Sequence, residues 1–202
     1  YLRSNLIPRF NPIAEYFDKL PKWVGGDHIR TLASYLPAKE PEQFLYHFRK
    51  WLVRTVKGAL DENYFNKQCL VLVHSEQNSG KSTWCRFLCP PALSKYFAED
   101  MTTDKDARIQ LTRNFIINLD ELSVLANDRK NSNLRRTCSF IGSTNRATFL
   151  NDETGSVRWL CFELIGKIDF AYSREVDIDK VWAQAYYLAY VDKQLNPELT
   201  LG

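Results

Sequence analysis

Long hydrophobic runs are missing from this sequence of 202 residues. No apolar stretch approaches the roughly 20 residues that a membrane-spanning helix requires, so we expect no association with a membrane. The first residues, Tyr1-Leu-Arg-Ser-Asn, lack the apolar segment of a secretory signal peptide. Methionine occurs once, at Met101, and we therefore expect residue 1 to lie within a longer polypeptide.

The sequence also has no strong excess of one charge, and its cysteines are too few by one to pair completely. The net charge is +3, which is too small to identify a nucleic-acid-binding protein by itself. The cysteine count is odd, and most of the five lie in apolar strands or helix faces, which favours buried free thiols in a reducing cytoplasm. Cys85 and Cys89 are one helical turn apart, as metal ligands can be, but no Cys or His pair of matching spacing lies nearby.

The composition that is present, 45% hydrophobic and 25% charged, is that of a globular domain, and the length favours one domain with an extension. The first third of the chain has helical patterns. Caps at Asn11 and Asp27 predict helices over Pro12–Leu20 and His28–Leu36, and Pro41 opens a long third helix. An apolar stripe runs along the third helix, made of Phe44, Phe48, Trp51, Leu52 and Val56. We predict an N-terminal helical subdomain over residues 1–65.

A row of basic residues lies on another side of the long helix, at Lys50, Arg54 and Lys57. Such a row can contact phosphates, or it can simply be a solvated face. We expect the solvated face.

From Cys69 onward, strand-like runs alternate with helical patterns. Strands are expected at residues 69–74, 114–119, 137–144 and 159–164, with a weaker one near Tyr96. Helices are expected over Asp104–Leu111 and over Asp179–Val191, the second capped by Asp179. Strands interleaved with helices predict an α/β fold with a mostly parallel sheet flanked by helices, here over residues 66–202 and ending in a C-terminal helix.

One strand runs directly into a Gly-Lys-Ser turn, in Cys69-Leu-Val-Leu-Val-His74-Ser-Glu-Gln-Asn-Ser-Gly80-Lys81-Ser82. A strand, a glycine loop and a helix start form an anion-binding nest, in which Lys81 reaches the β- and γ-phosphates and Ser82 binds Mg²⁺. A surface turn is the alternative interpretation, and Ser75 stands where the full pattern has glycine. The predicted nucleotide-binding residues are Ser75, Glu76, Gln77, Asn78, Ser79, Gly80, Lys81, Ser82 and Thr83.

Two acids end the next strong strand, in Phe115-Ile-Ile-Asn-Leu-Asp120-Glu121. Ligands collect at the carboxyl ends of the strands of an open α/β sheet, so a carboxylate there lies beside the phosphate loop. We expect Asp120 to bind the Mg²⁺ shell and Glu121 to orient and deprotonate the attacking water. An Asp-Glu pair alone is often only a solvated turn.

Two further residues complete a candidate hydrolytic site. Asn145 ends the strand at 137–144 and is placed to hydrogen-bond the γ-phosphate or the water, although asparagine also forms turns. Arg158 precedes the last strand and can stabilise a transferring phosphoryl group, in its own subunit or in a neighbour. A simple ion pair with Asp152 is the alternative for Arg158.

The order of these parts resembles the P-loop ATPase core of superfamily three helicases and, more closely, the virulence-associated protein E (VirE-like) family of phage, plasmid and genomic-island proteins. The matching segments are Asn11-Pro-Ile-Ala-Glu-Tyr-Phe17, Leu20-Pro-Lys-Trp23, Asp27-His-Ile29, Gln77-Asn-Ser-Gly-Lys-Ser82, Asn118-Leu-Asp-Glu-Leu122, Phe140-Ile-Gly-Ser-Thr-Asn145 and Asn151-Asp-Glu-Thr-Gly-Ser-Val-Arg-Trp159. The resemblance covers nearly the whole chain.

The resemblance implies an AAA+-like P-loop sheet, Mg²⁺-dependent ATP hydrolysis, and work on DNA during replication of a bacterial or phage-borne mobile element. It implies a Walker A role for Lys81 and Ser82 and a Walker B role for Asp120 and Glu121. Asn145 then matches the sensor, and Arg158 matches the arginine finger. Related helicases form rings, commonly hexamers, so we expect a homo-oligomer, with a primase region in the same or a partner chain.

The chain departs from the family pattern at two places. Ser75 replaces the first loop glycine, which constrains the turn if that position needs a positive φ. The stretch between Asp120 and Thr137 is barely long enough for a parallel crossover, and we hypothesise that residues are absent near Leu125 to Asn127. The remaining stretch is basic and predicts contacts with the backbone of single-stranded DNA, with solvated loop charges as the alternative; these residues are Arg129, Lys130, Arg135 and Arg136.

We therefore interpret the sequence as the ATP-binding and hydrolysing domain of a replication protein, acting as a DNA helicase or translocase. The rival interpretation is a DNA-binding or assembly module that holds ATP and turns it over slowly or never. A P-loop kinase is a third interpretation, for which no site for a phosphate acceptor is apparent in the sequence.

Overall fold

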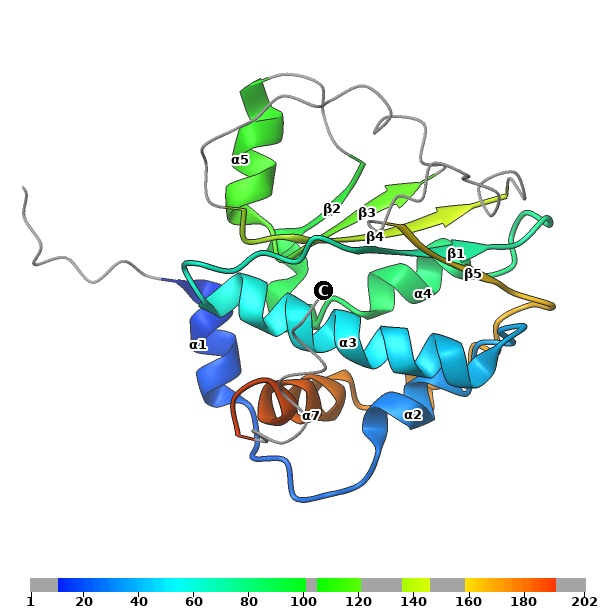
Figure 1. Cartoon of the computed structure of the whole chain (residues 1–202), viewed down its shortest axis with the longest axis horizontal. Helices are drawn as coiled ribbons and strands as arrows, with labels where there is room; N and C mark the ends of the chain where they lie inside the picture. The colour runs from blue at the N-terminus through cyan, green and yellow to red at the C-terminus, as the bar shows by residue number, and fades with distance from the viewer. Residues whose placement is uncertain (1–10, 101–104, 121–135, 146–158, 192–202) are drawn as a thin grey trace, which may run out of the picture.

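The computed structural model describes residues 11–100, 105–120, 136–145 and 159–191 (Figure 1). The helices are α1 (Pro12–Lys19), α2 (His28–Ala33), α3 (Pro41–Leu60), α4 (Lys81–Phe87), the 3-10 helix η1 (Pro91–Tyr96), α5 (Lys105–Arg113), α6 (Tyr172–Glu175) and α7 (Ile178–Tyr190). The strands are β1 (Cys69–Val73), β2 (Phe97–Glu99), β3 (Ile116–Asp120), β4 (Ser139–Thr144) and β5 (Trp159–Glu163).

The five strands form one sheet in the order β2-β3-β4-β1-β5, and every pair of neighbours is parallel. The α/β class and the parallel sheet expected from the sequence are therefore confirmed. Strand β1 leads on to β2 at one edge of the sheet, whereas its neighbour β4 leads on to β5 at the other edge. Such a reversal marks the carboxyl ends of β1 and β4 as the place where an open sheet binds ligands.

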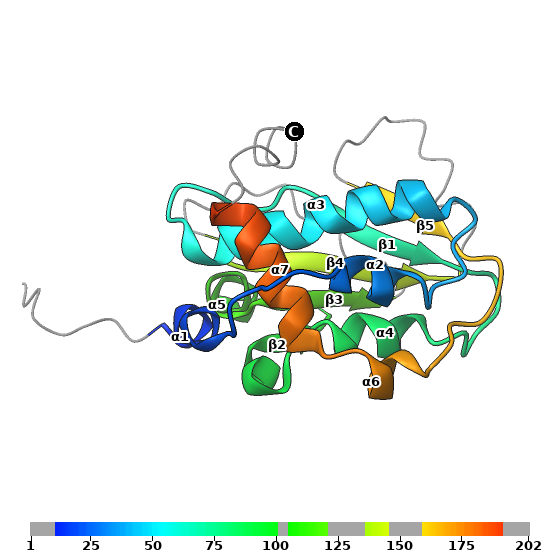
Figure 2. The same ribbon diagram turned by 90° about the horizontal axis from the view of Figure 1, so that it is seen from below.

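Helices α3 and α4 lie on one face of the sheet, and α7, α1 and α2 cover the outer side of α3 (Figures 1 and 2). The side chains of β1 alternate between two apolar clusters, as strand geometry requires. Leu70 and Leu72 join the large cluster beneath the helices, whereas Val71 and Val73 join a smaller one on the opposite face, which Leu111 of α5 adjoins. The large cluster unites residues from α1 through α7, and the division at residue 65 stays a prediction.

Side-chain caps begin the first two helices at the predicted residues. The Asn11 carboxamide oxygen accepts hydrogen bonds from the backbone N–H groups of Ile13 and Ala14, at 3.1 and 3.2 Å. The Asp27 carboxylate accepts from the Arg30 N–H at 3.1 Å. Both are ordinary helix caps, because they satisfy N–H groups that have no partner within the helix.

The predicted cap of the C-terminal helix is wrong by two residues. Asp177, not Asp179, caps α7, and its side chain accepts from the Asp179 N–H at 3.0 Å. Asp179 instead accepts a hydrogen bond of 2.7 Å from the Tyr16 hydroxyl on α1. The two aspartates are equivalent as sequence signals, and only the packing of α1 against α7 separates their roles.

The predicted solvated row on α3 is wrong at Arg54. The apolar stripe of this helix is buried as predicted, but Arg54 is only 4% exposed and donates a hydrogen bond to the Gln68 side chain. The segment after α3 turns back against the helix, because Asn66 lies 3.5 Å from the Thr55 hydroxyl and Gln68 accepts from Arg54. An arginine buried among polar partners in this way stabilises the fold and is not free to meet a phosphate.

Among the described residues, no helix has both the length and the apolar character needed to cross a membrane. The five cysteines are free, and three of them are buried. Burial raises the pKa of the Cys85 thiol and raises that of Cys138 to about 12, so both stay protonated at neutral pH. Within the described part of the chain, no cluster of three metal-binding side chains surrounds Cys85 and Cys89.

Candidate functional site

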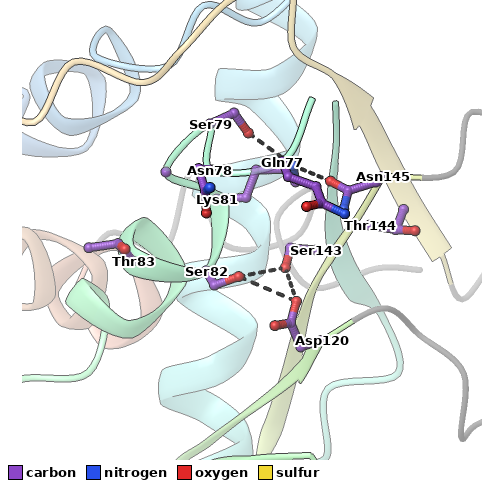
Figure 3. A pocket seen from close by; sticks show the side chains of 11 residues that line it. Gln77, Asn78, Ser79, Lys81, Ser82, Thr83, Asp120, Ser143, Thr144 and Asn145 are labelled. Atoms are coloured by element: carbon purple, nitrogen blue, oxygen red, sulfur yellow. Dashed lines mark hydrogen bonds between the residues drawn. The ribbon is translucent and has the colours of Figure 1, made fainter. Parts of the chain in front are cut away.

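A polar cavity of about 320 Å³ opens at the carboxyl ends of the central strands (Figure 3). Three segments that are far apart in the sequence meet there: the loop after β1 with the start of α4, the end of β3, and the end of β4. The lining residues are Gln77, Asn78, Ser79, Gly80, Lys81, Ser82, Thr83, Asp120, Ser143, Thr144 and Asn145.

The loop between β1 and α4 is shaped by two residues in the left-handed region, Asn78 with φ of 58° and Gly80 with φ of 93°. Gly80 is also close to the segment after β5, since a Cβ atom at this position would lie 3.0 Å from Cζ of Phe170. The Ile168 N–H donates to the Ser79 carbonyl at 3.0 Å and fixes that segment to the loop. The left-handed φ at position 80 favours glycine, and a side chain there would press against the Phe170 ring.

Ser75 is not among the described residues with a positive φ. The conformational demand for glycine therefore falls on position 80 and is met there, while the serine at position 75 keeps an ordinary backbone. The sequence departure at Ser75 imposes no backbone strain on the loop.

The Lys81 ammonium is enclosed by oxygen acceptors, and the residue is only 6% exposed. Its Nζ donates to the Asn145 Oδ1 at 2.8 Å and to the Ser79 Oγ at 2.9 Å, with the carbonyls of Glu76 and His74 at 3.2 and 3.3 Å. Three N–H groups thus serve four acceptors, so at least one contact is shared. Burial lowers the pKa of Lys81, while the nearby Asp120 carboxylate acts in the opposite direction.

Ser82, Ser143 and Asp120 form a triangle of oxygen atoms beside the lysine (Figure 3). The Ser143 hydroxyl donates to the Asp120 Oδ1 at 2.8 Å, and the two hydroxyls of Ser82 and Ser143 are 3.1 Å apart. The Ser82 Oγ lies 3.3 Å from the same Asp120 oxygen. The N–H of Asp120 donates to the side chain of Asp100 at 3.0 Å, and Asp100 adopts a φ of 61°.

The donor set of this site fits an anion together with a hard divalent cation. A buried ammonium and an amide side chain can bind phosphate oxygens. Hydroxyl and carboxylate oxygens are the ligands that Mg²⁺ prefers, and it is usually bound through one or two protein carboxylates plus water and substrate phosphates. The arrangement is therefore chemically suited to a phosphate ester accompanied by Mg²⁺.

The cavity brings together most of the predicted nucleotide-binding loop, from Gln77 to Thr83, with Asp120 and Asn145. Ser75 and Glu76 do not line it. Glu76 contributes through its backbone, because its carbonyl accepts from Lys81 and its N–H donates to the His74 ring at 3.2 Å.

Other predicted residues lie outside the described part of the chain. These are Glu121, Arg158, Arg129, Lys130 and Arg135, together with the segment at 125–127 that carries the hypothesis of absent residues. Their roles stay predictions.

Arg136 lies just before β4, at the amino end of the strand, whereas the cavity is at the carboxyl end. Its guanidinium lies 5.0 and 5.1 Å from the ring centres of Phe65 and Phe140, and it donates a hydrogen bond to the Asn66 carbonyl. These contacts stabilise the fold on one side of the residue and do not test its predicted contact with DNA.

Ser143, Thr144 and Asp100 were not predicted as site residues. Ser143 carried a usable signal, because residues two apart on a strand face the same side and Ser143 precedes Asn145 by two. Asp100 carried none, since its contact with Asp120 depends on the pairing of β2 with β3.

Comparison with known proteins adds a family and a fold. The family model for the virulence-associated protein E-like domain matches residues 17–132 and 125–199. An apo structure of the NrS-1 C terminal region has a TM-score of 0.56 at 15% identity over 88% of this chain and 49% of that one. The A form apo structure of the same NrS-1 region has a TM-score of 0.57 at 15% identity over 88% of this chain and 48% of that one. The chain thus spans about half of those structures, and a search of curated proteins found no match.

Proposed function

This chain belongs to the virulence-associated protein E-like domain family, and on that premise we propose that it is a P-loop ATPase domain of a replication protein that works on DNA. The observation that carries the proposal is the meeting of four residues around one cavity, from the start of α4 and the ends of β3 and β4: Lys81, Ser82, Asp120 and Asn145. A phosphate-binding lysine, a metal-binding hydroxyl, an acid and an amide are the groups that phosphoryl transfer to water requires.

Lys81 binds the β- and γ-phosphates in this proposal, and its present acceptors supply a way to do so. The contacts to Ser79 and Asn145 connect side chains, so each can be exchanged for a phosphate oxygen without breaking the backbone of the loop. The backbone carbonyls of Glu76 and His74 can keep their contacts with the ammonium while it binds the phosphates. Binding thus replaces neutral acceptors by charged ones, which form stronger hydrogen bonds.

Ser82 and Asp120 are the residues that would hold Mg²⁺. When bound, the ion neutralises charge on the phosphate oxygens and lowers the cost of the charge that develops during transfer. Glu121 follows Asp120 directly in the sequence and is our candidate general base for the attacking water.

Asn145 changes partners in the proposed cycle. Its Oδ1 now accepts from Lys81, whereas its amide N–H₂ group is of the right chemistry to donate to a γ-phosphate. We propose that Arg158 completes the site from a neighbouring subunit of a ring, and that the basic stretch at residues 129–136 binds single-stranded DNA as in a helicase or translocase.

ATP hydrolysis by the isolated chain, with and without single-stranded DNA, tests the proposal. The expected result is Mg²⁺-dependent release of phosphate that DNA stimulates. Glu121→Gln should bind ATP and lose turnover by about 10²- to 10⁴-fold, the size of a general-base contribution. Glu62→Gln is the matched control, since Glu62 follows α3 and lies outside the cavity.

Two results would contradict the proposed ATP-driven work on DNA. Turnover that is unchanged in Glu121→Gln would remove the proposed mechanism. ATP binding without turnover, in any oligomeric state that mass measurement detects, would favour the rival function of a nucleotide-dependent DNA-binding or assembly module.

Arg158→Ala should keep ATP binding and lose turnover. Mixing this variant with Glu121→Gln should restore activity only if the arginine acts in a neighbouring subunit.

A further inference from the structure

Ser143 is a buried serine placed between the two side chains that we assign to the metal. It is 1% exposed and lies opposite Asp120 in the parallel register of β4 with β3. Directly paired residues on one face of a sheet have adjacent side chains, so the register itself brings the Ser143 hydroxyl to the Asp120 carboxylate. On its other side, the hydroxyl is 3.1 Å from that of Ser82, at the start of α4.

The hydroxyl protons of this triangle can be assigned from their acceptors. Ser143 has one proton, and the short contact of 2.8 Å to Asp120 uses it. Ser143 can then only accept from Ser82, so the Ser82 proton points to Ser143 or to the more distant Asp120 oxygen at 3.3 Å. Either direction uses the Ser82 proton on a protein acceptor and leaves the lone pairs of the Ser82 oxygen available to a cation.

A hydroxyl binds a cation through a lone pair, so the direction of its proton decides whether it can act as a ligand. We infer that Ser143 is a positioning residue for the divalent cation: it orients the Ser82 hydroxyl and the Asp120 carboxylate and does not itself bind the metal. The inference rests on the proposed function, because it concerns the Mg²⁺ that accompanies the nucleotide. Partners behind the ligands of a metal commonly fix ligand orientation in this way, and their loss weakens metal binding about 10- to 100-fold.

Strand β4 contains a matched control for the experiment. Ser139 lies four residues earlier, on the same face of the strand, and is also fully buried. Its hydroxyl contacts the Asn66 amide at 3.2 Å and lies at the amino end of the strand, whereas the cavity is at the carboxyl end. Ser143→Ala and Ser139→Ala therefore delete the same atom from the same strand at similar burial, and only the first deletion touches the proposed ligands.

The test measures ATP affinity of each variant as a function of Mg²⁺ concentration, and again in EDTA. In Ser143→Ala, the Mg²⁺ concentration that gives half of the full increase in ATP affinity should rise about tenfold. This is the lower end of the loss in metal affinity that follows when such a partner is removed. The variant's affinity for metal-free ATP should stay within about twofold, because the hydrogen-bond acceptors of Lys81 are His74, Glu76, Ser79 and Asn145, all of which this substitution leaves in place. Ser139→Ala should match wild type in both measurements, and Ser143→Thr, which restores a hydroxyl, should recover most of the Mg²⁺ response.

The outcomes separate this inference from the proposed function. If Ser143→Ala and wild type share one Mg²⁺ dependence, the inference is wrong and the proposed function stands. If Ser143→Ala lowers affinity equally with and without Mg²⁺, the hydroxyl has only a structural role and the inference is also wrong. If wild type binds no ATP under any condition, the proposed function fails and the inference fails with it. Urea unfolding of each variant identifies any loss that comes from instability.

Discussion

The two ends of the sheet contain similar polar residues in opposite arrangements. At the amino end of β4, the Asn66 amide donates to Ser139, and its oxygen accepts from the Gln68 N–H at 3.1 Å. Arg136 adds a hydrogen bond to the Asn66 carbonyl. At the carboxyl end, Lys81, Ser82, Asp120 and Asn145 also bond to one another, but they line a cavity.

The two networks differ in whether they line a cavity and not in burial, since Asn66 and Ser143 are both 1% exposed. The amino-end network is closed, because the Asn66 side chain forms hydrogen bonds with neighbouring segments of the fold and does not line the cavity. The carboxyl-end network can be rearranged in the proposed function, since a ligand in the cavity can replace the contacts of Lys81 with the Ser79 and Asn145 side chains. Equivalent substitutions at the two ends should therefore divide cleanly between stability and binding.

Lys81→Ala should give the largest effect on the ATP binding that we propose. The ammonium is the central cation of the cavity, and charge-assisted hydrogen bonds contribute about 1.5–3 kcal/mol each, so ATP affinity should fall by about 100-fold or more. Isothermal titration measures the loss. Lys180→Ala, at an exposed position on α7, is the control and should bind ATP as wild type does. ATP affinity that survives in Lys81→Ala would place the nucleotide elsewhere.

Asn66→Ala should give the reverse pattern at the closed end. Loss of the amide leaves the Ser139 hydroxyl and the Gln68 N–H without this partner, and each buried group left unsatisfied costs about 1–3 kcal/mol. The free energy of unfolding, measured with urea, should fall by about 2 kcal/mol, whereas ATP affinity changes by less than about twofold. A large loss of affinity in a folded variant would mean that the two ends are coupled.

Alkaline pH should weaken ATP binding earlier than an ordinary lysine would. Burial lowers the pKa of Lys81 from its usual 10.5, so the ammonium loses its proton at a lower pH and affinity then falls by up to about tenfold per pH unit. The lowered pKa of Lys81 has the opposite consequence for stability, which should increase with pH. The buried charge opposes folding below its folded pKa, and this cost disappears as pH rises toward 10.5. Affinity and urea unfolding measured from pH 7 to 10 should therefore diverge; a joint decline would indicate unfolding.

Ser75→Gly should have the smallest effect. Because the described residues with positive φ in this loop are Asn78 and Gly80, a glycine at position 75 relieves no strain. ATP affinity should change by less than about twofold, and the added backbone entropy of the unfolded chain should lower stability by about 0.5–1 kcal/mol. A tenfold gain in affinity would show that the serine side chain obstructs the site.

Local patterns were the part of the sequence that predicted structure well. The caps at Asn11 and Asp27 bond to residues within three positions, and the apolar run at 69–73 forms a buried strand, so both depend on neighbours in the chain. Arg54 and Asp179 were misjudged for the converse reason. Each has a partner that packing supplies: Gln68 from the segment that covers α3, and Tyr16 from α1.

The sequence by itself determined the α/β alternation, the Gly80-Lys81-Ser82 turn and the chemical types present at the strand ends. These follow from periodicity and from the conformational freedom of glycine, which act over a few residues. Only the tertiary structure decided which of those ends meet. The Ser143 hydroxyl reaches the Asp120 carboxylate, and the Asp100 side chain accepts from the Asp120 N–H, because the parallel strands pair in one particular register. Register is a property of the whole sheet, since a slip of one residue would turn each of these side chains to the opposite face.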